Sequence, residues 1–333
     1  MEIIMNENIN ISDKLLTVTP SPHIKRNSRV NSVMLEVLIA LLPASAWGVY
    51  AYGWRALMIL LISVASCVVF ELLTELILKR PITVGDLSAA VTGLLLGMNL
   101  PSHTKWWIPI VGSFFAIVVV KQLFGGIGKN FLNPALAGRV FLFLSFSSQM
   151  SVYSPSVFDA DAVASATVLG QIKGGAAPNV SILDCFFGRT GGGMIGEISA
   201  LLLLIGGIYL LIRGIIQWHI PVAYIVTCAV FFFLFPSVEG SAVNSMLYEL
   251  LSGGLMIGAL FMATDYVTSP VTRWGRIIFG VGCGLLTFFF RRFTSYPEGV
   301  SFAILVMNCF VFYIDRATKP RIFGQKKFAS KKH

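Results

Sequence analysis

Ten apolar segments dominate this chain and constrain its fold more than any other feature. They lie at residues 33–50, 54–78, 87–100, 106–122, 131–147, 195–217, 219–236, 246–264, 274–290 and 299–316. A helix that crosses a membrane needs roughly 20 mostly apolar residues, and most of these segments approach that length. Only 12% of the residues are charged, which is about half the fraction typical of soluble domains. The pattern predicts an all-α integral membrane protein with about ten transmembrane helices.

Two of these segments are too short to cross a bilayer as regular helices. They cover residues 87–100 and 131–147, and Asn133-Pro134 interrupts the second. Discontinuous helices of this kind are typical of transporter-like folds built from inverted repeats. A faint internal repeat points the same way. Leu87, Ser88 and Met98 recur as Leu251, Ser252 and Met262, and Trp106, Ile110 and Gly112 recur as Trp274, Ile278 and Gly280. We therefore expect two inverted five-helix halves, residues 33–147 and 195–316.

The distribution of basic residues predicts an orientation. The net charge of +9 could suggest a nucleic-acid partner, but Lys and Arg lie at the ends of apolar segments and in the C-terminal tail. With a cytoplasmic N-terminus, about 18 of them fall in inner segments and about six in outer segments, as the positive-inside rule requires. This predicts a multi-pass protein of the cell inner membrane that binds no nucleic acid. Residues 1–32 and the tail 317–333 would be cytoplasmic, and residues 148–194 would face outside.

The outward-facing segment contains a run of small residues that ends in a threonine. The run reads D-A-V-A-S-A-T from Asp161 to Thr167. Small neighbours leave the Thr167 hydroxyl unobstructed, so a modifying enzyme could reach it and a bulky group could lie close to the backbone. By composition alone, such a run is typical of an ordinary loop.

This run is similar to the flavin-attachment motif D-G-x-S-G-A-T, in which FMN is joined to the threonine by a phosphoester. The motif belongs to the family of the D subunit of the Rnf complex and the B subunit of the sodium-pumping NADH:quinone reductase. Residues 124–135 and 258–266 resemble the same family, and the short N-terminal segment favours the Rnf protein. The resemblance implies covalent FMN on Thr167, with Asp161, Ser165 and Ala166 beside it. Here Ala164 and Ser165 stand in place of the motif's Ser-Gly.

The resemblance also implies a function. The chain would be one membrane subunit of a translocase of the ferredoxin:NAD⁺ oxidoreductase type, inactive alone, in which electron transfer drives Na⁺ or H⁺ transport. Its partners would be the other Rnf subunits (A, B, C, E and G), ferredoxin and NAD(H) through those subunits, and a flavin transferase. A second, noncovalent flavin such as riboflavin stays open. The alternative is a secondary transporter with inverted repeats and no redox cofactor.

Polar residues within the apolar segments are candidates for an ion path. Asp86, Asn133 and Asp265 lie at the ends of short predicted helices, and ionisable residues at membrane depth usually serve a function. Glu71 and Glu75 are four residues apart and share one helical face, where we expect them to reach interfacial water. The five cysteines form no CxxC pair, so no metal-ligating residue is predicted. No catalytic residue is predicted either.

Two glycine-rich stretches need separate interpretations. Residues 191–196 match G-x-G-x-x-G, but no strand precedes them, so we reject a dinucleotide site. The loop 124–130 has two interpretations that the sequence leaves open. It is either a tight turn that needs the freedom of glycine, or a set of backbone amides suited to an anion or the edge of a flavin.

Overall fold

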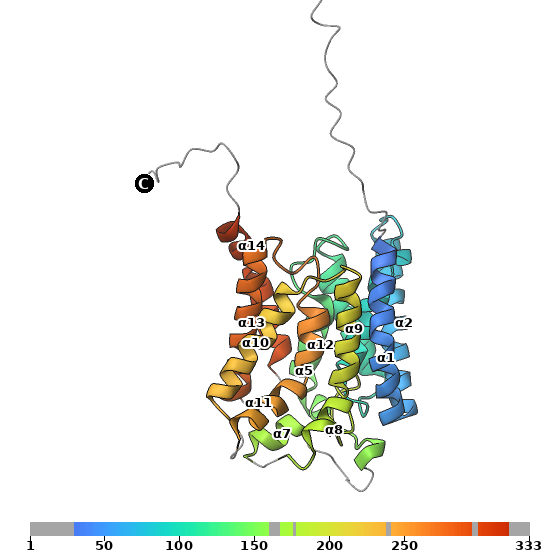
Figure 1. Ribbon diagram of the computed structural model, residues 1–333. Helices are drawn as coiled ribbons and strands as arrows, with labels where there is room; N and C mark the ends of the chain where they lie inside the picture. Colours follow the sequence, from blue (N-terminus) through green and yellow to red (C-terminus); the bar gives the residue numbers. More distant parts are fainter. Residues whose placement is uncertain (1–29, 160–166, 176–177, 238–240, 295–298, 320–333) are drawn as a thin grey trace, which may run out of the picture.

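The computed structural model describes residues 30–159, 167–175, 178–237, 241–294 and 299–319 (Figure 1). Over these residues the chain forms helices and loops, and its only β-type pairing is an isolated bridge between Pro101 and Met194. The helices up to residue 150 are α1 (Val30–Tyr52), α2 (Trp54–Ile77), the 3₁₀ helix η2 (Val84–Asp86), α3 (Ser88–Met98), α4 (Trp107–Phe114), its π-helical continuation η3 (Phe115–Gln122), α5 (Pro134–Ser145) and α6 (Ser147–Met150).

The remaining helices fall into a short middle group and a longer final group. The middle group contains η4 (Val157–Asp159), α7 (Val168–Lys173) and α8 (Ile182–Phe187). The final group contains α9 (Ala200–Ile212), α10 (His219–Leu234), α11 (Ala242–Leu251), α12 (Leu255–Ile257), the π-helical η5 (Gly258–Met262), α13 (Arg273–Phe293) and α14 (Val300–Thr318).

Helix length and composition confirm an all-α membrane protein. Within the described residues, α1, α2, α13 and α14 are long and apolar enough to cross a membrane. The count is five if α11 and the following helix, which meet at 64°, form one broken span. The 24 residues of α2 extend about 36 Å at 1.5 Å per residue, and the hydrocarbon core is about 30 Å thick. Shorter apolar helices occupy the other five predicted segments.

The two segments predicted to be too short to cross a bilayer form the short helices α3 and α5. They contain 11 and 12 residues, so each covers about half of a bilayer. The start of α5 follows from its sequence. The Asn133 side chain accepts hydrogen bonds from the amides of Ala135 and Leu136, and Pro134 occupies the first helical position, where its missing N–H is tolerated. The helix therefore begins at residue 134, three residues later than the apolar segment suggested.

Equivalent helices in the two sequence halves have equivalent neighbours. Helix α3 packs on α1 and α2, as α12 and η5 pack on α9 and α10. Helix α4 packs on α2, as α13 packs on α10. Helix α5 packs on α3 and α4, as α14 packs on η5 and α13. The two sets meet through α1 against α9 and α5 against α14.

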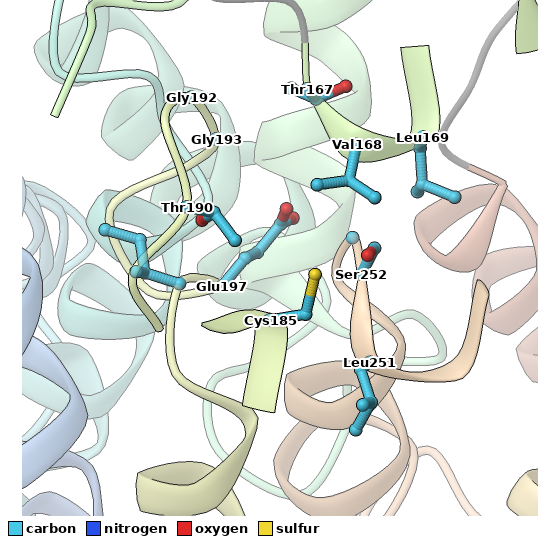
Figure 2. Close-up of a pocket in the computed structure, with 12 residues that line it drawn as sticks. Thr167, Val168, Leu169, Cys185, Thr190, Gly192, Gly193, Glu197, Leu251 and Ser252 are labelled. Carbon is cyan, nitrogen blue, oxygen red and sulfur yellow. The ribbon is translucent and has the colours of Figure 1, made fainter. Parts of the chain in front are cut away.

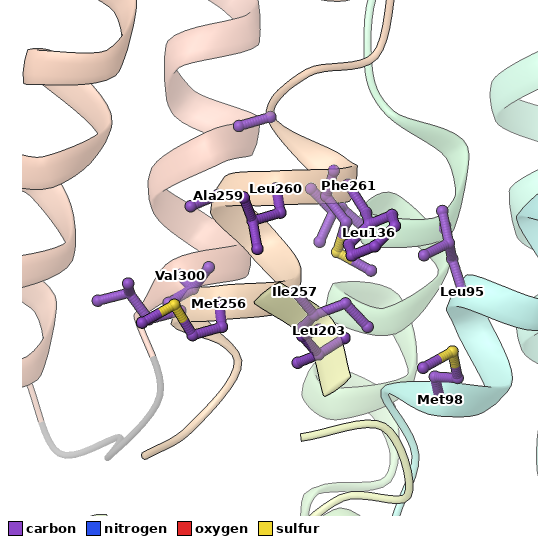
Figure 3. Close-up of a cluster of buried hydrophobic side chains, with 14 of the residues drawn as sticks. Leu95, Met98, Leu136, Leu203, Met256, Ile257, Ala259, Leu260, Phe261 and Val300 are labelled. Carbon is purple, nitrogen blue, oxygen red and sulfur yellow. The ribbon is translucent and has the colours of Figure 1, made fainter. Parts of the chain in front are cut away.

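The core lies where the short helices α3, α5 and α12 meet (Figure 3). Met98 of α3, Leu136 of α5 and Ile257 of α12 are all fully buried there. Small residues bring backbones into close contact around this core. A Cβ on Gly206 of α9 would lie 2.4 Å from the backbone oxygen of Ala40 on α1. Such close approach is the usual way in which membrane helices gain packing energy.

The bundle has two distinct ends (Figure 1). Helix α1 begins and helix α14 ends at the same end of the bundle, whereas α7, α8 and α11 lie at the opposite end. The segment that contains Thr167 is therefore far from both ends of the described chain.

Candidate functional site

Thr167 is the only residue of the predicted attachment motif D-A-V-A-S-A-T that lies within the described residues. Asp161, Ser165 and Ala166 lie outside them. Thr167 is the N-cap of α7, and its Oγ1 accepts a hydrogen bond of 3.0 Å from the amide of Gly170. A threonine is favoured at this position because its oxygen satisfies an amide that has no partner within the helix. The residue is half-buried, and the cap holds its hydroxyl in place.

Thr167 borders a small cavity, which we call the Thr167 cavity (Figure 2). Its volume is about 30 Å³, and its lining residues come from α7, α8, the loop before α9 and the turn after α11. Gly192 and Gly193 contribute backbone without side chains on one side. Cys185 and Glu197 line the other sides. The carboxylate of Glu197 points toward α7. The glycine-rich run 191–196 therefore lets the backbone of this loop pass close to its neighbours.

Burial changes the chemistry of the thiol in this cavity. Cys185 is 1% exposed. The pKa of its thiol is raised to about 11, mainly by burial; a hydrogen bond with Ser252 lowers this pKa, and the nearby charge of Asp184 raises it. The thiolate is the reactive form of cysteine, so Cys185 is inert at neutral pH.

A buried arginine lies next to this cavity. Arg139 of α5 is 4% exposed, and its Nη1 donates to Asn99 Oδ1 at 3.1 Å and to Ser301 Oγ at 2.5 Å. Its Nη2 lies 3.7 Å from Glu197 Oε1. One cation thus connects the end of α3, the middle of α5, the first turn of α14 and the loop before α9.

A second cavity, the Asp265 cavity, lies near the start of α1, at the other end of the bundle. Its volume is about 360 Å³, and its lining is mostly apolar with a few polar groups, among them Ser88, Lys121, Asn133 and Asp265. Asp265 accepts a hydrogen bond of 3.0 Å from Thr268 Oγ1. Asn133 Nδ2 donates to the backbone oxygen of Met262 at 3.2 Å. Cavities of this size and lining are typical of sites for small molecules and cofactors.

The structure brings the three ion-path candidates together around the Asp265 cavity. Asn133 and Asp265 line it directly. Asp86 lies one step away, because its Oδ1 accepts from Ser88 Oγ at 2.5 Å, and Lys121 Nζ donates to that same hydroxyl at 2.6 Å. The three residues are separated by up to 179 positions in the chain (Asp86 to Asp265), and the fold collects them at one end of the bundle.

The expectation that Glu71 and Glu75 reach interfacial water was wrong. Their exposed fractions are 0% and 2%. Glu71 Oε1 accepts from Lys121 Nζ at 2.5 Å and from Gln122 Nε2 at 3.0 Å. Glu75 Oε2 accepts from the amide of Thr83 at 3.0 Å. Protein hydrogen-bond donors replace the water, because η3 and the loop before α3 pack against this face of α2.

The structure of the glycine loop 124–130 confirms the first of its two interpretations. Gly125, Gly126 and Gly128 have φ values of 114°, 90° and 84°, a backbone region that favours glycine. The loop is therefore a tight turn. Its residues Ile127, Gly128 and Asn130 also line the Asp265 cavity.

Sequence reasoning missed two polar residues beside the Thr167 cavity. Arg139 lies inside the apolar segment 131–147 and received no functional interpretation, although a charge at membrane depth is itself a signal of function or of a buried partner. Glu197 follows directly after the glycine-rich run and received no interpretation. Its proximity to Thr167, 30 positions away (Thr167 to Glu197), depends on how the loop folds.

The fold and these sites define a class: polytopic all-α membrane proteins with broken helices, a cavity at each end of the bundle and a capping threonine beside one of them. Comparison with known proteins gives the family. The NQR2, RnfD, RnfE family matches residues 17–324, and the chain belongs to this family.

Curated relatives agree over nearly the full chain. The chain is 49% identical to the D subunit of the Na⁺-translocating ferredoxin:NAD⁺ oxidoreductase complex of Acetobacterium woodii, covering 94% of this chain and 96% of the relative. It is 39% identical to the D subunit of the ion-translocating oxidoreductase complex of Stutzerimonas stutzeri, covering 90% and 93%. It is 38% identical to the D subunit of the proton-translocating ferredoxin:NAD⁺ oxidoreductase complex of Clostridium ljungdahlii, covering 95% and 98%.

Proposed function

We propose that this chain is the D subunit of an ion-translocating ferredoxin:NAD⁺ oxidoreductase complex and that it carries FMN on Thr167. The observation that carries the assignment is the 49% identity to a protein of that name over 96% of the relative's length. Relatives named for Na⁺ and for H⁺ both align with the chain, so the transported ion is left open between these two.

The surroundings of Thr167 suit a phosphoester. Thr167 Oγ1 acts as the acceptor from Gly170 N, and an ester oxygen keeps that role, so the helix cap survives attachment. The Thr167 cavity is too small to enclose an isoalloxazine ring, since its volume is about 30 Å³. Thr167 and the cavity would therefore hold the attached end and leave the ring outside the cavity. When bound, a flavin supplies one- and two-electron redox chemistry, while the protein supplies position and electrostatics.

The same proposal includes an arrangement in the inner membrane. Ten crossings in two inverted halves are supported by the equivalent neighbours of equivalent helices and by the helix or helix pair at each predicted segment. Cytoplasmic termini and an outward-facing Thr167 are supported by the excess of Lys and Arg in the inner segments. Electrons from ferredoxin would then cross the bilayer through carriers in the other subunits (A, B, C, E and G), and a flavin transferase would attach FMN.

The Asp265 cavity is our proposed location for a second, noncovalent flavin such as riboflavin. A volume of about 360 Å³ falls in the range of ligand sites. Lys121, Asn133 and Asp265 offer hydrogen-bonding groups within an apolar lining, which suits a flat aromatic ring with polar edges.

Charge balance supports coupling between electron and ion transfer. Opposite charges about 4 Å apart attract by about 4 kcal/mol at an effective dielectric constant of 20. Moving one charge across 100 mV takes about 2.3 kcal/mol, which is less than this attraction. A reduced flavin could therefore draw a cation into the membrane. Asp86, Asn133 and Asp265 are the residues that we propose for the path of Na⁺ or H⁺, since they gather at the Asp265 cavity.

The test uses the assembled complex in membrane vesicles. Thr167→Val should abolish ferredoxin-driven NAD⁺ reduction and the ion uptake coupled to it. Thr190→Val is the matched control, because Thr190 lines the same cavity and should leave both activities intact. Undiminished pumping by the Thr167→Val complex would contradict the proposal. Ion-coupled solute transport by flavin-free protein would support a secondary transporter instead.

A further inference from the structure

A third cavity, which we call the Arg292 cavity, lies beside α7 at the same end of the bundle as Thr167 (Figure 1). Its volume is about 270 Å³, and its described lining residues come from α7, α10, the turn after α10, α11 and α13. Three of them are cations, Lys173, Arg291 and Arg292, and one is a carboxylate, Glu249. Among the described residues, the lining of this cavity therefore has an excess of positive charge.

The two inner charges of this cavity compensate each other. Arg291 and Glu249 are 7% and 5% exposed, and their opposite charges attract. Arg291 also donates to the backbone oxygens of Glu249 and Ser252, so its guanidinium is tied to α11 and to the turn after it. The excess of positive charge thus comes from Lys173 and Arg292.

Lys173 and Arg292 stand on the exposed side of the cavity. Arg292 Nη1 donates to Ser237 Oγ at 2.6 Å, which uses one of the five N–H donors of a guanidinium. Lys173 Nζ donates to the backbone oxygen of Thr294, the residue that follows α13. A guanidinium and an ammonium at one cavity suit a phosphate group, whose oxygens accept several charge-assisted hydrogen bonds.

The cavity lies at the depth of the lipid headgroups. Helix α13 contains 21 residues and extends about 32 Å, which matches the ~30 Å thickness of the hydrocarbon core. Arg291 and Arg292 lie in its last turn, where the hydrocarbon ends. Basic residues are scarce here, since about six Lys and Arg fall in the predicted outer segments, and three of them line this one cavity. The cluster is thus separate from the general excess of basic residues at the opposite end.

An exposed aromatic surface continues from the cavity along α13 and the end of α10. Phe288 lines the cavity, and its ring centroid lies 5.6 Å from that of Phe235. Phe235 and Phe289 are each 51% exposed, and Phe289 shares a face of α13 with Arg292, three residues later. A soluble anion would use the cations alone. A phospholipid offers a phosphate for the cavity and acyl chains for the aromatic surface.

We propose that the Arg292 cavity binds an acidic phospholipid of the surrounding bilayer. Its phosphate lies at Lys173 and Arg292, and its acyl chains lie against Phe235 and Phe289. Basic pockets between membrane helices recognise acidic headgroups in this way. An acidic lipid is favoured over a zwitterionic one because the described lining keeps an excess of positive charge after the inner pair is compensated. The site does not depend on the flavin proposed for Thr167.

The test is photo-crosslinking in phosphatidylcholine vesicles that contain the whole complex. The probe is phosphatidylglycerol with a diazirine on one acyl chain, added as a small fraction of the lipid. Peptide mapping should find it on the peptides that carry Phe235 or Phe289. Phosphatidylcholine with the same labelled chain should react there roughly tenfold less, since basic residues at the membrane surface favour an anionic lipid. Equal yields from the two probes would show ordinary surrounding lipid and overturn the proposal.

A double variant tests the two cations. Lys173→Gln with Arg292→Gln should lower the phosphatidylglycerol yield roughly tenfold and leave the phosphatidylcholine yield unchanged. Arg55→Gln is the matched control, since Arg55 is an exposed basic residue near the start of α2 and is not among the described residues that line the cavity. An undiminished yield in the double variant would overturn the proposal. If this variant does not fold, the comparison of the two probes on the wild type still decides.

A competing anion separates the lipid from free phosphate. Inorganic phosphate, added in place of chloride at equal ionic strength, should leave the phosphatidylglycerol yield unchanged. Loss of the crosslink would mean that the cavity binds free phosphate, which would contradict a lipid site. In-gel fluorescence of the same samples measures the covalent flavin. A wild-type chain without flavin that still prefers phosphatidylglycerol would refute the proposed function and support this site.

Discussion

Lys121 Nζ on η3 donates to Glu71 Oε1 on α2 across 2.5 Å, and the two side chains are 3% and 0% exposed. The same ammonium donates to Ser88 at the start of α3. At the opposite end of the bundle, Arg291 near the end of α13 donates to the backbone oxygen of Ser252, at 3.1 Å, just before α12. Ser88 and Ser252 correspond to each other in the internal repeat that the sequence suggests. Each half thus anchors its broken helix with a buried cation from its fourth helix.

Breaking the first of these anchors should destabilise the protein. Glu71→Gln leaves Lys121 buried without a counter-charge, which typically costs about 3–5 kcal/mol. Replacing both residues with methionine should cost much less, because no charge then stays buried alone. Thermal unfolding of the purified protein in detergent measures both effects, with Glu36→Gln as the control: Glu36 is only half-buried and pairs with the exposed Arg213, so its loss should change Tm little. A Glu71→Gln protein that unfolds like the wild type would show that the pair is not needed.

Close packing of α1 and α9 predicts a specific sensitivity to a single methyl group. Gly206→Ala would place a Cβ 2.4 Å from Ala40 O and 3.0 Å from the ring of Phe261. Overpacking of this kind typically destabilises by about 1–3 kcal/mol. Gly85→Ala is the matched control, since nothing lies within 4 Å of its Cβ position. The same unfolding measurement should separate the two variants, and equal Tm values would contradict the packing described here.

The reactivity of Cys185 should report whether the Thr167 cavity is closed. Because the pKa of its thiol is raised to about 11, the thiolate is a small minority at pH 7 and becomes abundant only near pH 11. In a Cys309→Ser background, which removes an exposed thiol, we expect negligible alkylation of Cys185 by a maleimide at pH 7 in the folded protein and rapid alkylation after unfolding. Leu183→Cys in a Cys185→Ser background should react quickly at pH 7, because residue 183 lies on the same helix and is 67% exposed. Rapid labelling of native Cys185 would mean that the cavity is open.

Filling the Asp265 cavity should remove the proposed noncovalent flavin. Thr92 lines this cavity, and Thr92→Phe would place a ring in it. The flavin that acid extracts from the purified complex should fall, while the covalent fluorescent band on a denaturing gel stays the same. Unchanged extractable flavin would place that cofactor elsewhere or exclude it.

Local sequence signals were enough to predict the short helices α3 and α5 and to single out Thr167. Asn133-Pro134 specifies a helix start by its own chemistry, because asparagine is a favoured N-cap and proline is tolerated at the first helical position. The break therefore appears where the dipeptide occurs, whatever packs around it. Thr167 stands out in the sequence because of its small neighbours, whereas its role as the cap of α7 appears only in the structure.

The buried ion pairs could not be predicted, because each joins residues far apart in the chain. Glu71 and Lys121 are 50 positions apart, and Arg139 and Glu197 are 58 apart (139 to 197). A glutamate near a helix end looks the same in sequence whether it meets water or a lysine. Only the packing of η3 against α2, and of the loop before α9 against α5, decides which partner it finds.

The central claim, covalent FMN on Thr167, is tested most directly by mass. The chain should be purified from its native membrane, weighed intact and then mapped by peptides. Our account predicts an excess equal to one FMN minus one water, located on the peptide that contains Thr167. A chain of unmodified mass in the assembled, active complex would contradict it.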